Sequence, residues 1–238
     1  MIPKYIHYCW FGSAEKPEVF QKCIDSWGTL YPDFKIIEWN ETNSVLRNSV
    51  YAMEAFECRK YAFVADYVRL KVLAEYGGIY LDTDVEMLER DCSLENMDFV
   101  AGFEADNRIG TAIIFAQKND PLIIEWLQGY ENRHFRQKNG KMDMTPNVRE
   151  LTELLERDGW QINGREQQKD RRILLPRDSF YPYSIGDRNV CLKRSLAVHW
   201  CEGSWVSGKL KLKHNFIRFA KSLLGKTRYE RLRKLLIR

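Results

Sequence analysis

Along the first 200 residues, short apolar runs alternate with longer stretches in which apolar residues recur at helical spacing. The short runs are rich in β-branched and aromatic residues and are bounded by glycine, proline or polar residues, as is typical of strands. They predict strands over residues 2–10, 34–39, 79–85, 99–103, 112–116, 172–175 and 196–200. The longer stretches predict helices over residues 17–30, 45–76, 121–130 and 146–157. This alternation indicates an α/β domain around a largely parallel sheet, where ligands bind beyond the carboxyl ends of the strands.

Proline and glycine mark the ends of several predicted helices. Pro17 suits the first turn of a helix, and Thr145 followed by proline predicts an N-cap before the helix over 146–157. Gly77-Gly78 ends the long helical stretch, because glycine readily takes the left-handed conformation that closes a helix. One apolar stripe is expected along the second half of that stretch, formed by Ala62, Ala65, Val68, Val72 and Tyr76.

Composition and charge divide the chain into a domain and a tail. The 238 residues are 45% hydrophobic and 29% charged, and no apolar run approaches the roughly 18 residues of a membrane span. The net charge of +4 is unevenly spread, because residues 211–238 hold ten basic side chains and one acidic one while residues 1–210 carry a net charge of −5. We therefore predict one domain over residues 1–210 and a basic tail over residues 211–238.

The amino terminus and the cysteines favour a cytoplasmic location. The first ten residues lack the basic, apolar and small-residue regions of a secretory signal, so we expect no export by that route. The six cysteines include no CxxC pair and are expected to be reduced thiols.

Charged residues that suggest chemistry are concentrated between residues 65 and 85. Asp66 and Arg69 are three residues apart on a predicted helix and share a face. Asp82 and Asp84 follow an apolar strand, are two residues apart and are expected to point the same way. Two carboxylates with open coordination positions suit Mg²⁺ or Mn²⁺ bound to a diphosphate. The competing interpretations are a solvated Asp-x-Asp turn and a surface ion pair between Asp66 and Arg69.

Three segments, in order, resemble glycosyltransferase family 32, which includes capsular and lipopolysaccharide transferases, mannosyltransferases and, more distantly, clostridial glucosylating toxins. Residues 65–85 resemble its Asp-x-Asp sugar-binding region, and residues 2–12 resemble its first strand. His199-Trp200 followed by Ser204-Trp205 is similar to its closing elements. The resemblance covers most of residues 1–205. It implies a GT-A fold, a Rossmann-like nucleotide-diphospho-sugar transferase domain that acts with retention of anomeric configuration.

The resemblance also implies roles for individual residues. Asp82, Asp84 and His199 would hold the metal ion, and Asp66 and Arg69 would join the two aspartates in catalysis. The residues expected to bind the donor are Ile6, His7, Trp10, Asp66, Arg69, Tyr80, Ser204 and Trp205. Lys209 would add positive charge there, and Glu104 or Asp106 marks where a nucleophile would sit if transfer does not proceed by front-face attack. Core packing remains the alternative for His7 and Trp10, and a half-buried structural histidine is the alternative for His199.

The basic tail shows two amphipathic patterns broken at Gly225, with lysine and arginine between the apolar positions. Such a surface suits interfacial helices on an anionic membrane, while a helix packed on the domain is the alternative. Nucleic acid is not an expected partner, because no recognised nucleic-acid-binding motif accompanies the charge.

The sequence thus predicts a metal-dependent retaining glycosyltransferase that uses Mn²⁺ or Mg²⁺. We expect a UDP-sugar donor, with GDP-mannose second, and a saccharide or lipid-linked saccharide acceptor. The expected setting is capsule, lipopolysaccharide or other surface glycan synthesis, at the inner face of the cell membrane. The competing class is a non-catalytic membrane-surface or nucleic-acid-binding protein with an incidental Asp-x-Asp.

Overall fold

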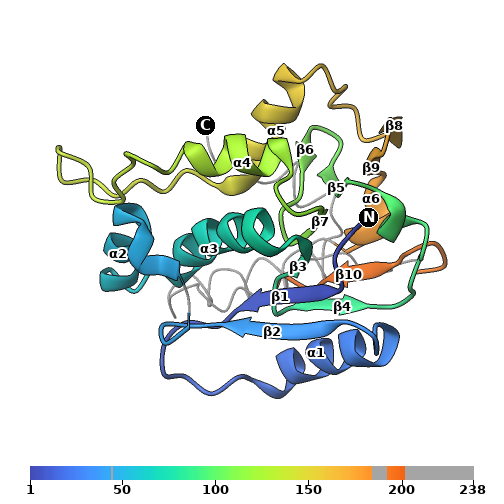
Figure 1. Ribbon diagram of the computed structural model, residues 1–238, viewed down its shortest axis with the longest axis horizontal. Helices are drawn as coiled ribbons and strands as arrows, with labels where there is room; N and C mark the ends of the chain where they lie inside the picture. Colours follow the sequence, from blue (N-terminus) through green and yellow to red (C-terminus); the bar gives the residue numbers. More distant parts are fainter. Residues whose placement is uncertain (44, 184–191, 202–238) are drawn as a thin grey trace, which may run out of the picture.

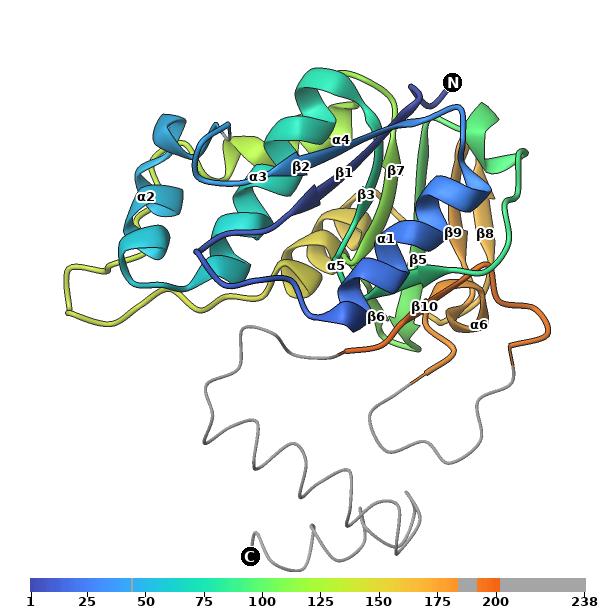
Figure 2. The same ribbon diagram turned by 90° about the horizontal axis from the view of Figure 1, so that it is seen from below.

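The computed structural model describes residues 1–43, 45–183 and 192–201. These residues form an α/β domain around one mixed sheet with the strand order β2-β1-β3-β7-β5-β9-β8 (Figures 1 and 2). Its strands are β1 (Tyr5–Cys9), β2 (Lys35–Trp39), β3 (Gly78–Leu81), β5 (Phe99–Ala105), β7 (Ile113–Ala116), β8 (Gln167–Lys169) and β9 (Arg172–Leu175). Strand β6 (Arg108–Ile109) pairs with β5 beside this path, and β4 (Val85–Met87) pairs with β10 (Ala197–His199) in a separate two-stranded sheet.

The helices cover both faces of the sheet. They are α1 (Glu18–Leu30), α2 (Val50–Glu57), α3 (Tyr61–Tyr76), α4 (Pro121–Gln128), α5 (Asn147–Arg157) and α6 (Arg177–Phe180), with short 3₁₀ turns at Val45–Asn48 and Leu94–Asn96. Helices α2 to α5 pack on one face, and α1, α6 and the β4–β10 pair pack on the other. The central strands supply both cores in alternation: in β3, Tyr80 joins the first, and Ile79 and Leu81 join the second.

The sheet is less parallel than the sequence predicts. β1 runs parallel to β2 and β3, and β5 runs parallel to β9. In contrast, β7 is antiparallel to both β3 and β5, and β8 is antiparallel to β9. The physical reason is connection length: the links from β5 to β7 and from β8 to β9 are too short for the crossover that a parallel pair requires.

Most predicted elements form close to their expected bounds, and the exceptions concern ends and burial. Gly77 closes α3 at φ +65°, as predicted, and its N–H donates to the carbonyl oxygen of Leu73 at 2.9 Å. The predicted N-cap role of Thr145 was wrong, because its hydroxyl donates to Asp143 at 2.7 Å instead. The single apolar stripe on α3 was also wrong. The helix lies between neighbouring helices and the sheet, so it is buried on several sides, while Tyr76 is 41% exposed.

Several other predictions are tested only within the described residues. No disulfide joins the cysteines there. None of the helices in the described ranges is long and apolar enough to cross a membrane. The predicted boundary at residue 210 and the basic tail lie outside the described residues.

Candidate active site

The site forms where the parallel strands β1, β2 and β3 end, at the sheet edge where α/β proteins bind ligands. After β3 the chain does not continue as a strand: it makes a turn closed by a hydrogen bond from the N–H of Val85 to the carbonyl oxygen of Asp82 at 3.0 Å. The N–H of Asp82 donates to Ala112 at 2.9 Å, and the N–H of Trp200 donates to the carbonyl oxygen of Asp84 at 3.0 Å. The predicted continuous strand over residues 79–85 was therefore wrong. The turn, and not strand alternation, orients the two aspartates.

The turn carries a cluster of possible metal ligands. Antiparallel pairing of β10 with β4 sets His199 opposite Val85, beside the turn. Ligand atoms of Asp82, Asp84 and His199 all lie within 4.8 Å of one another. The Nε2 atom of His199 is 3.2 Å from Oδ1 of Asp84. Burial by itself would lower the pKa of His199, but the carboxylate of Asp84 outweighs burial and raises that pKa well above its ordinary value. Two carboxylates and an imidazole fit Mn²⁺ best, and Mg²⁺ through the carboxylates.

Arg69 connects helix α3 to this turn. Its guanidinium contacts Oδ1 of Asp66 at 3.1 Å and Oδ1 of Asp82 at 2.8 Å, and it stacks on the Tyr80 ring at 4.5 Å. The residue is only 3% exposed, so the interpretation of Asp66 and Arg69 as a surface ion pair was wrong. Its Nε has no hydrogen-bond partner among the described residues. The two terminal nitrogens and the stacked ring therefore fix the position of the guanidinium.

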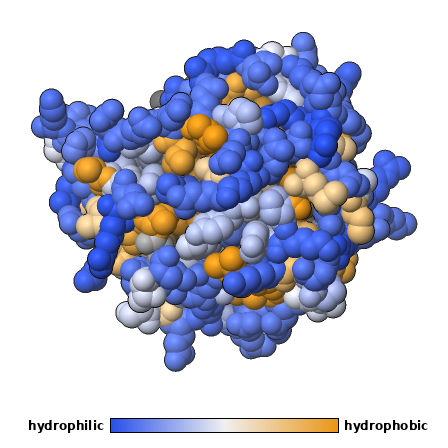
Figure 3. All heavy atoms as spheres, viewed as in Figure 1, coloured by the Kyte–Doolittle hydropathy of each residue, from blue (hydrophilic) through white to orange (hydrophobic). Residues whose placement is uncertain are grey.

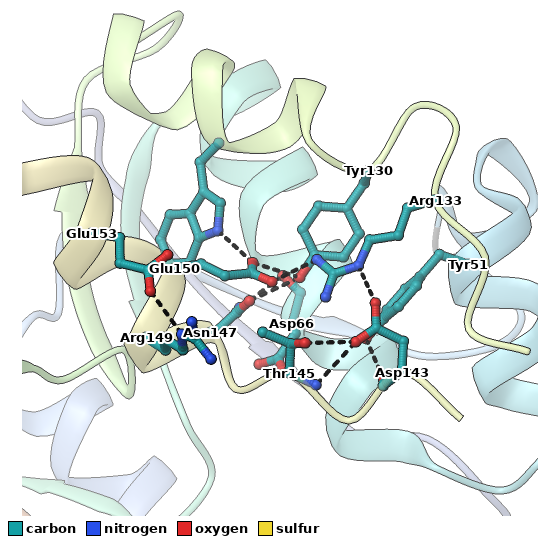
Figure 4. Close-up of polar contacts among 11 residues, drawn as sticks. Tyr51, Asp66, Tyr130, Arg133, Asp143, Thr145, Asn147, Arg149, Glu150 and Glu153 are labelled. Carbon is teal, nitrogen blue, oxygen red and sulfur yellow. Dashed lines mark hydrogen bonds and ion pairs between the residues drawn. The ribbon is translucent and has the colours of Figure 1, made fainter. Parts of the chain in front are cut away.

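A second polar network, which sequence reasoning missed, lies beside Asp66 (Figure 4). Asn147, the first residue of α5, donates from Nδ2 to the backbone oxygen of Asp66 at 3.3 Å and accepts from the hydroxyl of Tyr130 at 2.8 Å. Beyond it, Arg133 pairs with Glu150 at 2.6 Å and with Asp143 at 2.7 Å. The only signal in the sequence was the helix start after Thr145, which did not identify the partners.

Burial raises the pKa of Asp66 to about 7. Arg69 opposes this shift, while the nearby charges of Asp82 and Glu150 add to it. At neutral pH this carboxyl group is therefore close to its titration midpoint, so it can both accept and donate hydrogen bonds.

Three of the residues predicted to bind the donor are core residues. The side chains of Ile6 and His7 are 0% exposed, and Tyr80 is 1% exposed beneath Arg69. Both ring nitrogens of His7 are occupied, because Trp39 Nε1–H donates to Nδ1 at 3.1 Å and Nε2 lies 2.9 Å from the carbonyl oxygen of Gly77. These three side chains are enclosed because the first and third strands lie in the middle of the sheet and both of their faces are covered, and donor contact by them stays a prediction.

The remaining predicted residues lie at the edge or outside the described residues. Trp10 is half-buried just after β1, where its indole N–H donates to the carbonyl oxygen of Ala14 at 2.9 Å. Glu104 is half-buried in β5 and pairs with Arg108 at 3.4 Å; burial raises its pKa, against the charges of Arg108 and His199. Asp106 lies in the turn between β5 and β6. Ser204, Trp205 and Lys209 lie outside the described residues.

Comparison with known proteins finds relatives that are similar to this part of the chain. Residues 17–98, which include the Asp82–Asp84 turn, match the model of the glycosyltransferase sugar-binding region containing a DXD motif. Mannosyl phosphorylinositol ceramide synthase SUR1 of Saccharomyces cerevisiae is 34% identical over 92 residues, which is 35% of this chain and 23% of that protein. Inositol phosphoceramide mannosyltransferase 2 of Schizosaccharomyces pombe is 35% identical over 92 residues, 35% of this chain and 25% of that protein. The match thus spans about a quarter of the length of these curated relatives.

Solved structures support the fold. The PaToxG glycosyltransferase aligns with a TM-score of 0.51 and 20% sequence identity, over 66% of this chain and 70% of that one. Like it, this chain has the mixed α/β architecture of the GT-A type. Residues 17–98 are therefore similar to glycosyltransferase sugar-binding regions that contain a DXD motif, and they lie in a domain with the GT-A fold.

Proposed function

We propose that this protein is a metal-dependent glycosyltransferase that moves a sugar from a nucleoside diphosphate to a saccharide acceptor. The observation that carries the proposal is the cluster of Asp82, Asp84 and His199 at the carboxyl edge of the parallel strands, with Arg69 fixing Asp82 from behind. The match of this segment to a glycosyltransferase sugar-binding region supports it.

The residues of the site fit the electrostatics of this reaction. Cleavage of a glycosyl–phosphate bond leaves positive charge on the sugar ring and negative charge on the diphosphate. Asp82, Asp84 and His199 would hold Mn²⁺ or Mg²⁺, which as a Lewis acid neutralises charge on the departing diphosphate. Arg69 keeps Asp82 in position and adds a fixed positive charge beside it. Asp66, whose pKa is raised by burial, would hydrogen-bond a sugar hydroxyl. Retention of configuration is part of the proposal.

The donor, acceptor and location are proposals on the same basis. The sequence favours a UDP-sugar, and the names of the curated relatives, which speak of mannosyl transfer, support testing GDP-mannose with equal weight. The acceptor is a saccharide or lipid-linked saccharide of a surface glycan such as capsule or lipopolysaccharide. The basic residues 211–238 would attach the protein to the anionic inner face of the cell membrane, in the cytoplasm.

Calorimetric binding of UDP, GDP and their sugar derivatives, with Mn²⁺ and then with EDTA, tests the site. We expect metal-dependent binding that Asp82→Asn or Asp84→Asn weakens at least about tenfold, because each substitution removes a ligand charge. Asp25→Asn, an exposed carboxylate on α1, serves as the control. Unchanged nucleotide affinity in both site variants would favour the non-catalytic alternative. The anomeric configuration of the product, read by NMR, tests retention.

The tail is tested separately. Deletion of residues 213–238 should abolish binding to anionic liposomes while leaving donor hydrolysis intact, because the basic amphipathic patterns lie there and the metal cluster does not. Liposome binding that survives the deletion would show that the tail is not required for attachment.

A further inference from the structure

The exposed apolar side chains of the described residues are concentrated beside α2. Eight large hydrophobic side chains are exposed, and four of them lie on two adjoining segments: Val50 (53%), Met53 (36%), Met142 (44%) and Met144 (45%). The first two are on α2, and the other two flank Asp143 in a hairpin that we define as residues 133–144. A group of this kind in a polar setting marks an interaction surface.

Side-chain contacts fasten the hairpin to α2. Glu54 accepts from His134 at 3.0 Å and from the backbone N–H of Arg136 at 2.9 Å, and Glu57 pairs with Arg136 at 3.0 Å. Residues 50, 53, 54 and 57 share one face of α2 because they follow helical spacing. Val50 and Met53 therefore lie on the same face as the hairpin contacts and form one surface with its methionines.

The hairpin is ordered and projects from the domain. A bridge joins Arg136 to Met142, and the N–H of Gln137 donates to the carbonyl oxygen of Lys141 at 2.8 Å. Both ribbon views show residues 131–146 extending beside α2, on the side toward which β1 and β2 point (Figures 1 and 2). Hydrophobic side chains are visible among hydrophilic ones on that side of the surface (Figure 3). A projecting hairpin with a polar tip and apolar side chains along its returning arm suits a flat partner better than a concave one.

The charge of the tip identifies the partner. Lys138 and Lys141 are exposed, and no ion pair joins either of them to a carboxylate among the described residues. Residues 1–210 carry a net charge of −5, so an anionic surface repels most of the domain and attracts it only where cations gather without partners. Exposed methionines beside such lysines can enter the interface between headgroups and acyl chains.

We propose that the hairpin and the adjoining face of α2 form a second membrane contact, which docks on an anionic lipid bilayer and turns the carboxyl edge of the sheet toward it. Arg133, at the base of the hairpin, pairs with Asp143 and with Glu150 of α5, and Asn147 on the same helix as Glu150 reaches Asp66, so docking places the site next to the bilayer surface. This orientation rests on the proposed function, because it gives the site access to a lipid-linked acceptor. The contact itself does not depend on the proposed function; it adds to attachment by the basic tail and is too weak to hold the protein on vesicles alone.

Hydrogen exchange of the full chain, with and without vesicles, tests the contact. With vesicles of phosphatidylcholine and phosphatidylglycerol, amides of residues 136–144 should gain protection, and vesicles of phosphatidylcholine alone should give none. Lys138→Glu with Lys141→Glu should abolish this local protection and weaken vesicle binding by about 30-fold or more at low salt. Met142→Ser with Met144→Ser should reduce the protection without changing the charge.

The matched control reverses two lysines at the opposite edge of the sheet. Lys35→Glu with Lys118→Glu makes the same change in net charge, at the start of β2 and after the end of antiparallel β7. This control should keep the hairpin protection. The proposal is overturned if both charge variants weaken binding equally, if vesicles leave the exchange of residues 136–144 unchanged, or if the chain binds no anionic vesicles. Donor hydrolysis in vesicle-free solution separately reports on the proposed function, so the two can fail independently.

Discussion

The role of His7 can be decided by replacing it with glutamine. The imidazole is 0% exposed; it accepts from Trp39 at Nδ1, so Nε2 carries the proton that it donates to Gly77. Burial lowers the pKa of His7 to about 4, against the hydrogen bond to Gly77. Glutamine offers one acceptor and one donor in place of the two ring nitrogens, so His7→Gln removes the titration while it preserves the bonding capacity.

The sign and size of the effect follow from linkage. Because the folded pKa is depressed, the stability that His7 contributes is present above the unfolded pKa near 6.5 and is lost as pH falls through about 4. A difference of about 2.5 units corresponds to about 3 kcal/mol. The free energy of unfolding should therefore fall by about that much more in the parent protein than in His7→Gln between pH 7 and pH 4.

Urea unfolding of both proteins across this pH range, in the presence of EDTA, measures the difference. The prediction concerns only the difference in the free energy of unfolding between the parent and His7→Gln, because other groups also titrate in this range. His134→Gln, whose side chain is 59% exposed on the surface, is the control and should reproduce the parent's slope. Parallel pH profiles for the parent and His7→Gln would refute the reasoning. Loss of nucleotide affinity in His7→Gln with unchanged stability would restore His7 as a donor contact.

Three further predictions concern the site and its frame. Arg69→Met should lower the free energy of unfolding by about 3–5 kcal/mol, because it leaves the carboxylates of Asp66 and Asp82 without their buried cation. Adding Asp66→Asn should recover part of this loss, and urea titration that showed no recovery in the double variant would contradict the prediction. Gly78→Ala should lower the free energy of unfolding by about 2–4 kcal/mol, because Gly78 has a φ of +111° and a Cβ there would lie 2.5 Å from the carbonyl oxygen of Tyr5. Gly140→Ala, at a φ of +78° with no atom within 4 Å of the new Cβ, should lower it by only about 1 kcal/mol in the same assay. The pKa of Asp66 is raised in the folded state, so its contribution to stability is present below about pH 4 and is lost as pH rises through about 7. Without metal, the free energy of unfolding of the parent should therefore fall relative to that of Asp66→Asn over this range. A rise would exclude the assigned pKa shift.

Local chemistry was sufficient for much of the backbone prediction. The strand over residues 172–175 forms with the predicted bounds, and Gly77 ends α3 at a positive φ, although its ψ of −171° differs from that of the left-handed helical conformation. Both depend on neighbouring residues alone: a short apolar run in the first case and the absence of a Cβ in the second. The aspartates of the DXD turn were likewise recognisable from their spacing.

The directions of the strands and the contacts between distant segments could not be predicted from neighbouring residues. The sequence alone did not reveal that β7 enters the sheet antiparallel between β3 and β5, or that Asn147 reaches Asp66. His7 illustrates the same limit, because a histidine on a first strand is compatible with ligand contact until the pairing of β1 with both β2 and β3 shows that it is enclosed.

By itself the sequence determined the α/β class, most element positions, the charge asymmetry of the tail, and Asp82 and Asp84 as metal-ligand candidates, because periodicity, turn chemistry and spacing are local properties. The family resemblance also suggested His199 as a third ligand, and the structure sets it beside the two aspartates. Only the tertiary structure decided that Arg69 is buried between two carboxylates, and that α2 and the hairpin share one exposed apolar surface. Each of these arrangements brings together segments that are far apart in the chain. The packing of the whole domain sets how these segments approach one another, and the local spacing of residues does not encode it.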